Sequence, residues 1–292
     1  MVDDDGRTKG LDARATNLNG KPSKPQYYRR RRRAFYGALK YALRENQLSA
    51  NPLASPDDVE WKAPEVVQVL DRRRVPNPEQ VATLLTEIGK VGKTQGPRLV
   101  ALFGCLYYAM MRPSEAINRT KENCVSLPET GWGELELGEV KSAAGKQWTD
   151  DGEVYEARGL KGRPKDSRRP VPIPPELVAL LRHHLAEYGT GPGGRLFRTA
   201  RGGIYQPSTL WRVLNTARAK ALTPEQVKTP LACKPYDFRH AGISWRLIAG
   251  VPVVYVAIWA GNSPEIVQRV YTHALDGGDE LWLQRMDSAR GR

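Results

Sequence analysis

The sequence predicts an α+β fold that is mainly α-helical and contains a small antiparallel sheet of three strands. Apolar residues recur at helical spacing over most of the chain, whereas residues 132–173 form short alternating segments bounded by Gly, Asp and Pro. With 292 residues, 40% of them hydrophobic, the chain can bury one substantial core. We therefore expect one main domain with at most a small satellite.

The composition of the chain divides it into four parts. Residues 1–25 are polar and aperiodic, so we expect a disordered tail. Residues 26–50 carry an amphipathic helix, and residues 51–76 are rich in proline and are expected to form a linker. Residues 77–292 contain the remaining helical and strand patterns. They form the predicted main domain.

Prolines mark the beginnings of several predicted helices. A proline fits the first position of a helix, because the N–H that it lacks would be unpaired there. The helices are expected to start at Pro78 and Pro113, to cover Arg98–Met111 and Pro207–Ala221, to run from Pro174 to about Gly189, and to follow residue 235 as two helices and one further turn. A last short helix or tail is expected near the C-terminus.

The alternating segments predict three antiparallel strands. They are GELELGEV, GEVYEARGL and RRPVPIP, at residues 133–140, 152–160 and 168–174. Lys161 follows the second of them in a predicted hairpin turn.

The charge balance of the chain favours a polyanionic partner. Its 45 Lys and Arg residues outnumber 32 Asp and Glu residues, which gives a net charge of +13. Nucleic acid is the first expectation for so basic a protein, although a generally basic proteome would have the same effect. The first helix opens with five arginines that suit contact with a DNA backbone, namely Arg29, Arg30, Arg31, Arg32 and Arg33. A solvated basic run is the alternative.

The cysteines and the apolar segments favour a cytoplasmic protein. Cys105, Cys124 and Cys233 are widely spaced and form neither a metal-ligand pair nor a disulfide framework. The segment Leu99–Met111 is too short to span a membrane, and the N-terminus lacks the apolar region of a signal peptide. We expect no membrane association.

Residues 235–273 contain the strongest chemical pattern. Arg239 lies in a packed helix, and two short helices then bring Tyr271 back toward it. We interpret the arginine as a phosphate clamp and the tyrosine as a nucleophile. Tyr271 could instead be a core aromatic residue, and Tyr255 is its rival. Arg112, held at the junction before Pro113, could simply cap the helix or pair with Glu115.

Five motifs in order then resemble the catalytic domain of the tyrosine recombinases, the phage and plasmid integrases. They are MMRPSEA, LKGRPKDSRRPVPIP, YDFRH, AGNS and Tyr-Thr-His, and the likeness covers residues 77–292. Integrases of actinobacterial mobile elements are the most similar subgroup. The resemblance implies a site-specific DNA recombinase that acts on double-stranded DNA as a homo-tetramer, with no metal or nucleotide cofactor.

The resemblance also implies roles for individual residues. Arg112 and Arg239 would hold the scissile phosphate, and Tyr271 would attack it to form a 3′-phosphotyrosine. Lys161 would be the general acid for the leaving 5′-oxygen, with Lys146 and Lys165 as alternatives because the strand register is open. His240 and His273 are expected to be structural neighbours of the site, and His240 is a candidate DNA contact.

The chain departs from the family pattern in three ways. Tyr236 stands where the family often has histidine, and Asn262 stands where it usually has histidine or tryptophan. An amide cannot exchange protons at neutral pH, so Asn262 predicts a slower site. The N-terminal DNA-binding domain of the family is reduced to about one helix, which predicts a truncated or decayed integrase, or one whose start lies upstream. A remnant that only binds DNA and a type IB topoisomerase remain alternatives.

Overall fold

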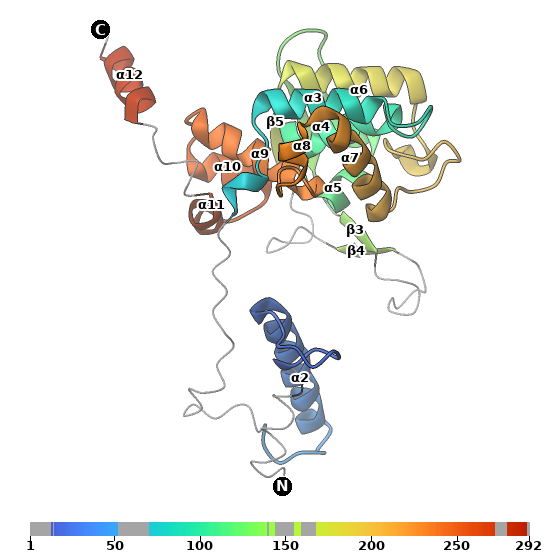
Figure 1. Cartoon of the computed structure of the whole chain (residues 1–292), viewed down its shortest axis with the longest axis vertical. Coiled ribbons are helices and arrows are strands. Elements are labelled where there is room, and N and C mark those ends of the chain that lie inside the picture. The colour runs from blue at the N-terminus through green and yellow to red at the C-terminus, as the bar shows by residue number, and fades with distance from the viewer. Residues whose placement is uncertain are drawn as a thin grey trace. The chain divides into compact units, whose positions relative to one another are not determined.

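The structure, a computed structural model, describes most of the chain (Figure 1). The described residues are 13, 15–51, 70–138, 140–143, 155–158, 168–271 and 279–290. Contacts between residues divide the chain into two compact units, Met1–Gln68 and Val69–Arg292. The larger unit therefore begins inside the segment 51–76 that we predicted to be a linker.

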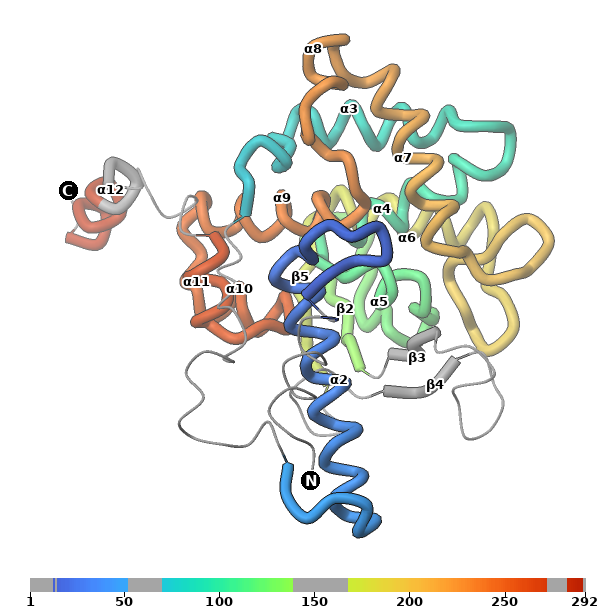
Figure 2. The backbone as a smooth tube through the Cα atoms, turned by 60° about the horizontal axis from the view of Figure 1, so that its bottom comes forward, coloured from blue at the N-terminus to red at the C-terminus, as the bar shows by residue number. Residues whose placement is uncertain are grey.

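The first unit is built on one helix, α2 (Pro25–Arg44), which begins at a proline as its sequence predicts (Figure 2). None of the residues of α2 is buried. A turn before the helix is fastened to it by Arg31, which donates hydrogen bonds to Thr16 O (3.0 Å) and Ser23 Oγ (2.8 Å). Lone amphipathic helices are stabilised mainly by packing partners.

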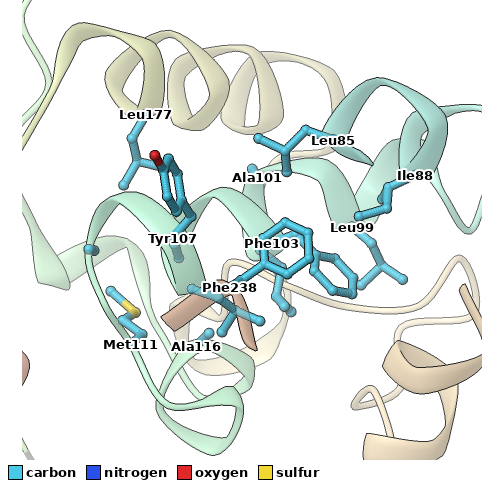
Figure 3. Packing of buried hydrophobic residues seen from close by; sticks show 14 of the residues in the cluster. Leu85, Ile88, Leu99, Ala101, Phe103, Tyr107, Met111, Ala116, Leu177 and Phe238 are labelled. Atoms are coloured by element: carbon cyan, nitrogen blue, oxygen red, sulfur yellow. The ribbon is translucent and has the colours of Figure 1, made fainter. Parts of the chain in front are cut away.

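The second unit is organised around α4 (Val100–Tyr108), whose residues Ala101–Tyr107 are all buried. Such an all-round apolar helix must be covered on every side. Figure 3 shows this packing, with Phe103 of α4 against Phe238, their ring centres 5.2 Å apart. The helices that contact α4 include α3 (Pro78–Gly89), α6 (Pro175–Tyr188) and α9 (Pro235–Ile248).

A glycine allows α9 to approach α4 closely. A Cβ atom added at Gly242 would lie 1.9 Å from the backbone oxygen of Tyr107, which is far inside van der Waals contact. This crossing places the next turns of α9 beside the C-terminal end of α4. Because Arg239 and His240 lie one turn before Gly242, the crossing fixes their position relative to the chain that follows α4.

Most of the remaining helices begin with proline, and all but α7 are short. They are α5 (Pro113–Ile117), α7 (Pro207–Ala221), α8 (Pro224–Val227), α10 (Val253–Ala260), α11 (Pro264–Val270) and α12 (Asp279–Ala289). Single 3₁₀ turns lie at η2 (Arg72–Arg74), η3 (Pro97–Leu99), η4 (Lys121–Asn123) and η6 (Pro192–Gly194). Helices α10 and α11 lie side by side (Figures 1 and 2).

A three-stranded antiparallel sheet completes the mainly helical unit, as the sequence predicts. Its order is β1 (Cys124–Ser126), β2 (Gly133–Leu137) and β5 (Arg169–Ile173). Two of the three predicted strands belong to it, but its third member is β1, which is too short to show alternation. Of the predicted segment 133–140, residues 133–137 form β2, and its last residue, Val140, begins β3 (Val140–Ala143), which pairs with β4 (Tyr155–Arg158) in a separate ribbon.

The two longer strands of the sheet alternate between a buried and an outer face. In β2 the buried residues are Gly133, Leu135 and Leu137, and in β5 they are Arg169, Val171 and Ile173. The register pairs Leu135 with Val171, so the apolar members share the core face. Arg169 is therefore a charged residue on the core face of a strand.

Two further properties concern membrane and metal binding. Within the described residues, no helix has the length and apolar character needed to cross a membrane. The same residues contain no group of three His, Cys, Asp or Glu side chains placed to hold a metal ion.

Candidate active site

The candidate site begins where α4 ends. Met110 has a positive φ of 51°, which turns the chain sharply, and Pro113 starts α5 three residues later. Arg112 is the N-cap residue between them, with an extended backbone. Its backbone N–H donates to Glu115 Oε2 (2.9 Å) and its Nη1 donates to Glu115 Oε1 (2.8 Å). The pairing with Glu115 that the sequence left as an alternative is therefore present.

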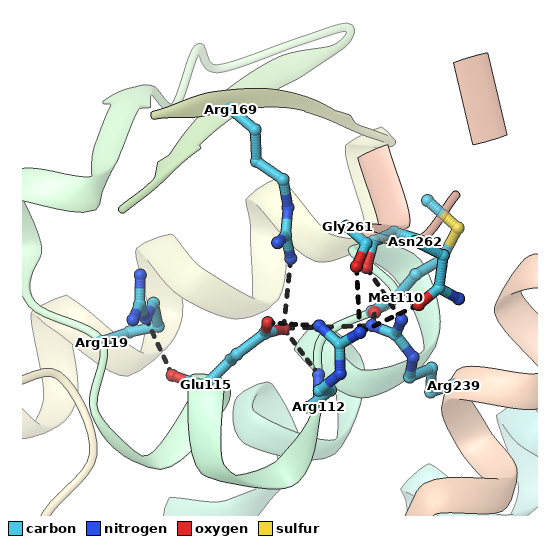
Figure 4. A network of polar contacts seen from close by, with 9 residues as sticks. Met110, Arg112, Glu115, Arg119, Arg169, Arg239, Gly261 and Asn262 are labelled. Carbon is cyan, nitrogen blue, oxygen red and sulfur yellow. Dashed lines mark hydrogen bonds and ion pairs between the residues drawn. The ribbon is translucent and has the colours of Figure 1, made fainter. Parts of the chain in front are cut away.

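Glu115 is the centre of a cluster of arginines (Figure 4). Its carboxylate lies 2.8 Å from Arg112, 3.1 Å from Arg169 and 3.9 Å from Arg239. Burial favours the neutral acid, but the charges of Arg169, Arg239 and Arg112 together outweigh burial and lower the pKa of Glu115 to about 2. Glu115 is thus ionised, and it holds three guanidinium groups in one place.

Arg239 lies on the buried face of α9 and is fully covered, with 0% of its surface exposed. It donates to the backbone oxygen of Met110 and, over 2.8 Å, to that of Ala260. These carbonyls stand at the ends of α4 and α10, so Arg239 joins the two helix termini. Cations are favourable at helix C-termini.

Asn262 lies in the turn after α10, where Gly261 ends the helix with a φ of 63°. Arg112 Nη2 donates to Gly261 O and to Asn262 Oδ1, both at 2.9 Å. The amide of Asn262 is therefore engaged by the same arginine whose other nitrogen contacts Glu115. About a quarter of the Arg112 side chain, 25%, remains exposed, in contrast to the covered Arg239.

Tyr271 caps the C-terminal end of α11 and points into the protein. Its backbone N–H donates to Val267 O (2.9 Å), and its hydroxyl lies 2.7 Å from His240 Nδ1. Burial, the largest influence, raises the pKa of Tyr271 above its ordinary value, although the charges of Arg239 and Arg112 oppose it. Only 2% of the residue is exposed. A phosphodiester can reach Tyr271 and Arg239 only after the side chains that cover them move.

Tyr236 borders the same group from the first turn of α9. Its ring lies 5.0 Å from that of His240, and the Arg239 guanidinium lies 5.8 Å from the Tyr236 ring centre. Burial acts to lower the pKa of Arg112, but the negative charge of Glu115 and the hydrogen bonds that Arg112 donates to Glu115 and Tyr236 raise it above the ordinary value. Tyr236 therefore contacts Arg112, and it does so from the position where tyrosine recombinases often have histidine.

The structure brings most of the predicted site residues into one neighbourhood. Arg112, Tyr236, Arg239, Asn262 and Tyr271 are linked through the contacts described above. Lys161 lies outside the described residues, as do its alternatives Lys146 and Lys165 and the neighbouring His273. The described strand β4 ends at Arg158, three residues before Lys161, and its partner β3 lies against α5.

The five arginines of α2 have different surroundings. Arg31 is bonded to the preceding turn, whereas Arg29, Arg32 and Arg33 line a shallow hollow together with Tyr36. Their spacing of three, four and seven residues places these four on one face of the helix. A DNA contact by Arg29, Arg30, Arg31, Arg32 and Arg33 remains a prediction, with Arg31 occupied within the unit.

Arg169 is the residue of the cluster that our sequence reasoning missed. It is 1% exposed, it donates to Glu115 Oε2 (3.1 Å), and a Cβ atom at Gly261 would lie 2.1 Å from its Nη1. Burial, the largest influence, lowers the pKa of Arg169 to about 10. Its Nε and Nη1 atoms have no partner among the described residues. The signal was present, because alternation puts Arg169 on the same face as Val171 and Ile173.

Solved structures of DNA recombinases have a similar fold. The Tn1549 transposon integrase, in complex with circular intermediate DNA, superposes with a TM-score of 0.67 at 15% identity, over 97% of this chain and 87% of the other. The XerH site-specific recombinase bound to difH substrate superposes with a TM-score of 0.60 at 19% identity, over 99% and 70%. The fold is thus that of the catalytic domain of DNA recombinases.

The sequence is also similar to those of integrases from mycobacteriophages. The integrase of Mycobacterium phage D29 is 26% identical over 176 residues, which are 55% of this chain and 45% of that protein. The integrase of Mycobacterium phage L5 is 23% identical over 171 residues, 53% of this chain and 44% of that protein. No family model matches the sequence. The chain spans about half the length of these relatives, and over that part its sequence is similar to those of phage integrases, which are tyrosine recombinases.

Proposed function

We propose that the protein is a site-specific DNA recombinase that cleaves and rejoins DNA strands through a 3′-phosphotyrosine at Tyr271. One observation carries the proposal. Arg112, Arg239 and Tyr271 come from distant parts of the sequence and meet around Glu115 and His240, in a chain related to phage integrases. No other described part of the chain gathers two arginines and a tyrosine around a buried carboxylate.

The chemistry explains why two arginines accompany the tyrosine. In-line attack on a phosphodiester builds negative charge on the non-bridging oxygens, and a guanidinium can donate two parallel hydrogen bonds to such oxygens. An arginine also stays charged at any working pH. Glu115 fixes Arg112 and Arg239 in advance, so little reorganisation is needed when a phosphate arrives. The covalent link to Tyr271 would conserve the energy of the broken bond for rejoining.

The leaving 5′-oxygen needs a proton, and we assign Lys161 as its donor. A lysine ammonium on a hairpin can move toward a bound strand, as a general acid must. The support is positional, because the β3–β4 ribbon that leads to Lys161 lies against α5, the helix that begins next to Arg112. Lys146 and Lys165 remain alternatives.

The proposed partner is double-stranded DNA with attachment sites. The net charge of +13 and the arginine face of α2 suit a polyanion. Strand exchange between two duplexes requires four cleavages, so we propose a homo-tetramer on DNA. We place this activity in the cytoplasm, where the thiols of Cys105, Cys124 and Cys233, free in the structure, would stay reduced.

Covalent capture on nicked DNA tests the proposal directly. A pool of nicked duplexes of randomised sequence, labelled on the 3′-phosphate side, should give an adduct that survives denaturing electrophoresis. Tyr271→Phe should abolish the adduct and leave binding intact, because the ring still fills its place in the cluster formed with Val256 and Val267. Peptide mapping of the wild-type adduct locates the label.

Tyr255→Phe is the matched control, since Tyr255 is 55% exposed on α10 and lies outside the arginine cluster. This variant should form the adduct at the wild-type rate. An adduct in Tyr271→Phe, or a label mapped to another residue, would contradict the assignment of the nucleophile.

A catalytically impaired remnant that only binds DNA is the second candidate. The observation that favours it is Asn262, whose amide is occupied by Arg112 and which cannot exchange protons at neutral pH. Loss of one transition-state contact commonly reduces the rate by about 10²–10³. A chain with DNA binding but no adduct at any pH would support this alternative.

Asn262→His separates the two candidates. If the rest of the site is competent, the histidine should increase the rate of adduct formation while DNA binding stays constant. Asn118→His, a change of the same kind at the end of α5, is the control and should have no effect. An inactive wild-type chain that also stays inactive as Asn262→His would leave only the DNA-binding candidate.

A further inference from the structure

The contact between His240 and Tyr271 places a possible proton acceptor beside the hydroxyl of the proposed nucleophile. His240 Nδ1 lies 2.7 Å from the Tyr271 hydroxyl, and the two residues come from different helices, 31 positions apart. From the sequence we expected His240 to be a structural neighbour of the site or a DNA contact. We propose that His240 is the general base that accepts the phenolic proton of Tyr271 when the tyrosine attacks DNA. This inference rests on the proposed recombinase function.

Tyr271 needs a base because its surroundings keep it neutral. Burial raises the pKa of its hydroxyl, and the opposing charges of Arg239 and Arg112 do not reverse that rise. A neutral phenol is a poor nucleophile toward a phosphodiester. The two arginines alone therefore do not activate Tyr271.

Three other side chains of the arginine cluster and its border are unsuited to the task. Glu115 has a pKa of about 2 and is engaged by three arginines, so it does not accept protons near neutrality. Asn262 presents an amide, which is not a base. Tyr236 is itself a phenol. The imidazole of a histidine has an ordinary pKa close to neutral pH, which suits proton transfer.

The geometry lies in the range that proton transfer requires. A general base must be within about 2.6–3.2 Å of the atom whose proton it takes, and the observed distance is 2.7 Å. The T-shaped contact with Tyr236, with ring centres 5.0 Å apart, holds the imidazole plane. His240 follows Arg239 directly on α9, so the element that fixes the phosphate clamp also fixes the base.

The step balances with the residues named. In this step His240 must carry its proton on Nε2, so that Nδ1 can accept the proton of Tyr271. As the tyrosine oxygen forms its bond to phosphorus, its O–H bond breaks and an Nδ1–H bond forms. The P–O5′ bond breaks, and the 5′-oxygen takes a proton from the general acid, which we assign to Lys161. On rejoining, the 5′-hydroxyl attacks phosphorus and gives its proton to the group assigned to Lys161. The bond from phosphorus to the tyrosine oxygen breaks, and the imidazolium returns its proton to the phenolate.

Positive charge near His240 sets the conditions for this step. The groups near it include Tyr236 on its own helix, Tyr271 at the end of α11, and the cations Arg239 and Arg112, whose charges reach the Tyr271 hydroxyl. The negative phosphate that DNA brings into the cluster would offset the positive charge that the imidazolium adds.

The test uses single-turnover adduct formation by the full chain on a nicked duplex selected by the wild-type protein. His240→Asn places an amide near Nδ1, so it can keep a hydrogen bond but cannot accept a proton. We expect its rate to fall about 10²–10⁴-fold with unchanged DNA binding. Below neutral pH the wild-type rate should rise with pH, and His240→Asn should lack this limb. His183→Asn, at an exposed histidine of α6, is the matched control.

A substrate with a sulfur leaving atom at the 5′ position separates base from acid. Because sulfur leaves without a proton, Lys161→Ala should recover on this substrate, whereas His240→Asn should stay slow. His240→Gln with a melting curve guards against a folding defect. A wild-type rate and pH profile in a folded His240→Asn would overturn the inference alone. A wild-type chain that forms no adduct would overturn the recombinase proposal together with the inference.

Discussion

Two regions meet at the candidate site, and they are fastened to the protein in different ways. Arg112, Glu115 and Arg169 are held by an ionic network just after the end of α4, a helix of the larger hydrophobic cluster. Tyr271 and Asn262 are held by α10 and α11, short helices whose buried residues belong to a smaller cluster. The contrast separates a preorganised phosphate clamp from a nucleophile that sits on a less firmly held element.

This difference agrees with what strand transfer demands. A clamp works best when it does not reorganise, because electrostatic stabilisation is lost if donors must move into place. A nucleophile that is 2% exposed must instead leave its pocket to reach DNA. Elements that move are drawn from the least stable parts of a protein. The comparison predicts that changes in the clamp mainly alter global stability, and changes in α11 mainly alter local opening.

The largest effect is expected at Glu115. Glu115→Gln removes the one negative charge among three buried or partly buried arginines, which leaves their charges uncompensated. Breaking a buried ion pair on one side costs about 3–5 kcal/mol, so we expect a loss of that size in the free energy of unfolding, measured in urea. Glu122→Gln, an exposed glutamate of η4, should change it by less than about 0.5 kcal/mol. Equal losses in both variants would refute the network.

The same carboxylate predicts how stability depends on pH. The folded-state pKa of Glu115, about 2, lies below its ordinary value of 4.5, so the unfolded chain binds more protons between these two values. The contribution of Glu115 is therefore fully present above pH 4.5 and is lost as the pH falls toward 2. A shift of this size corresponds to about 3 kcal/mol. The free energy of unfolding of the wild type should therefore fall as the pH is lowered from 4.5 toward 2. In Glu115→Gln this part of the pH dependence should be absent.

Particular residues show how far the sequence alone can lead. Helix starts at Pro78, Pro113 and Pro207 were predictable because proline acts locally. The gathering of Arg112 with Arg239 and Tyr271 followed from the family resemblance, but their contacts did not. The bonds from Arg169 to Glu115 and from His240 to Tyr271 join segments 54 and 31 residues apart, and no local pattern encodes them. The strand β1 escaped notice because only its pairing with β2 defines it.

The smallest effect should appear at the N-cap of α11, where it is most informative. Ser263 Oγ accepts a hydrogen bond from Ile266 N (3.4 Å), and α11 has only seven residues. Ser263→Ala should cost about 1 kcal/mol. Because so short a helix has few other bonds, hydrogen exchange should accelerate at residues 264–271 and leave α4 unchanged.

Thr223→Ala is the matched change at a helix away from the site, since Thr223 caps α8 in the same way, with Gln226 N as the donor (3.3 Å). Its exchange effect should stay within α8 and should not reach Tyr271. If α11 is the mobile carrier of the nucleophile, Ser263→Ala should also change the rate of adduct formation, whereas Thr223→Ala should not. If Ser263→Ala forms the adduct at the wild-type rate and leaves hydrogen exchange in α11 unchanged, Tyr271 is held as firmly as the arginines of the clamp.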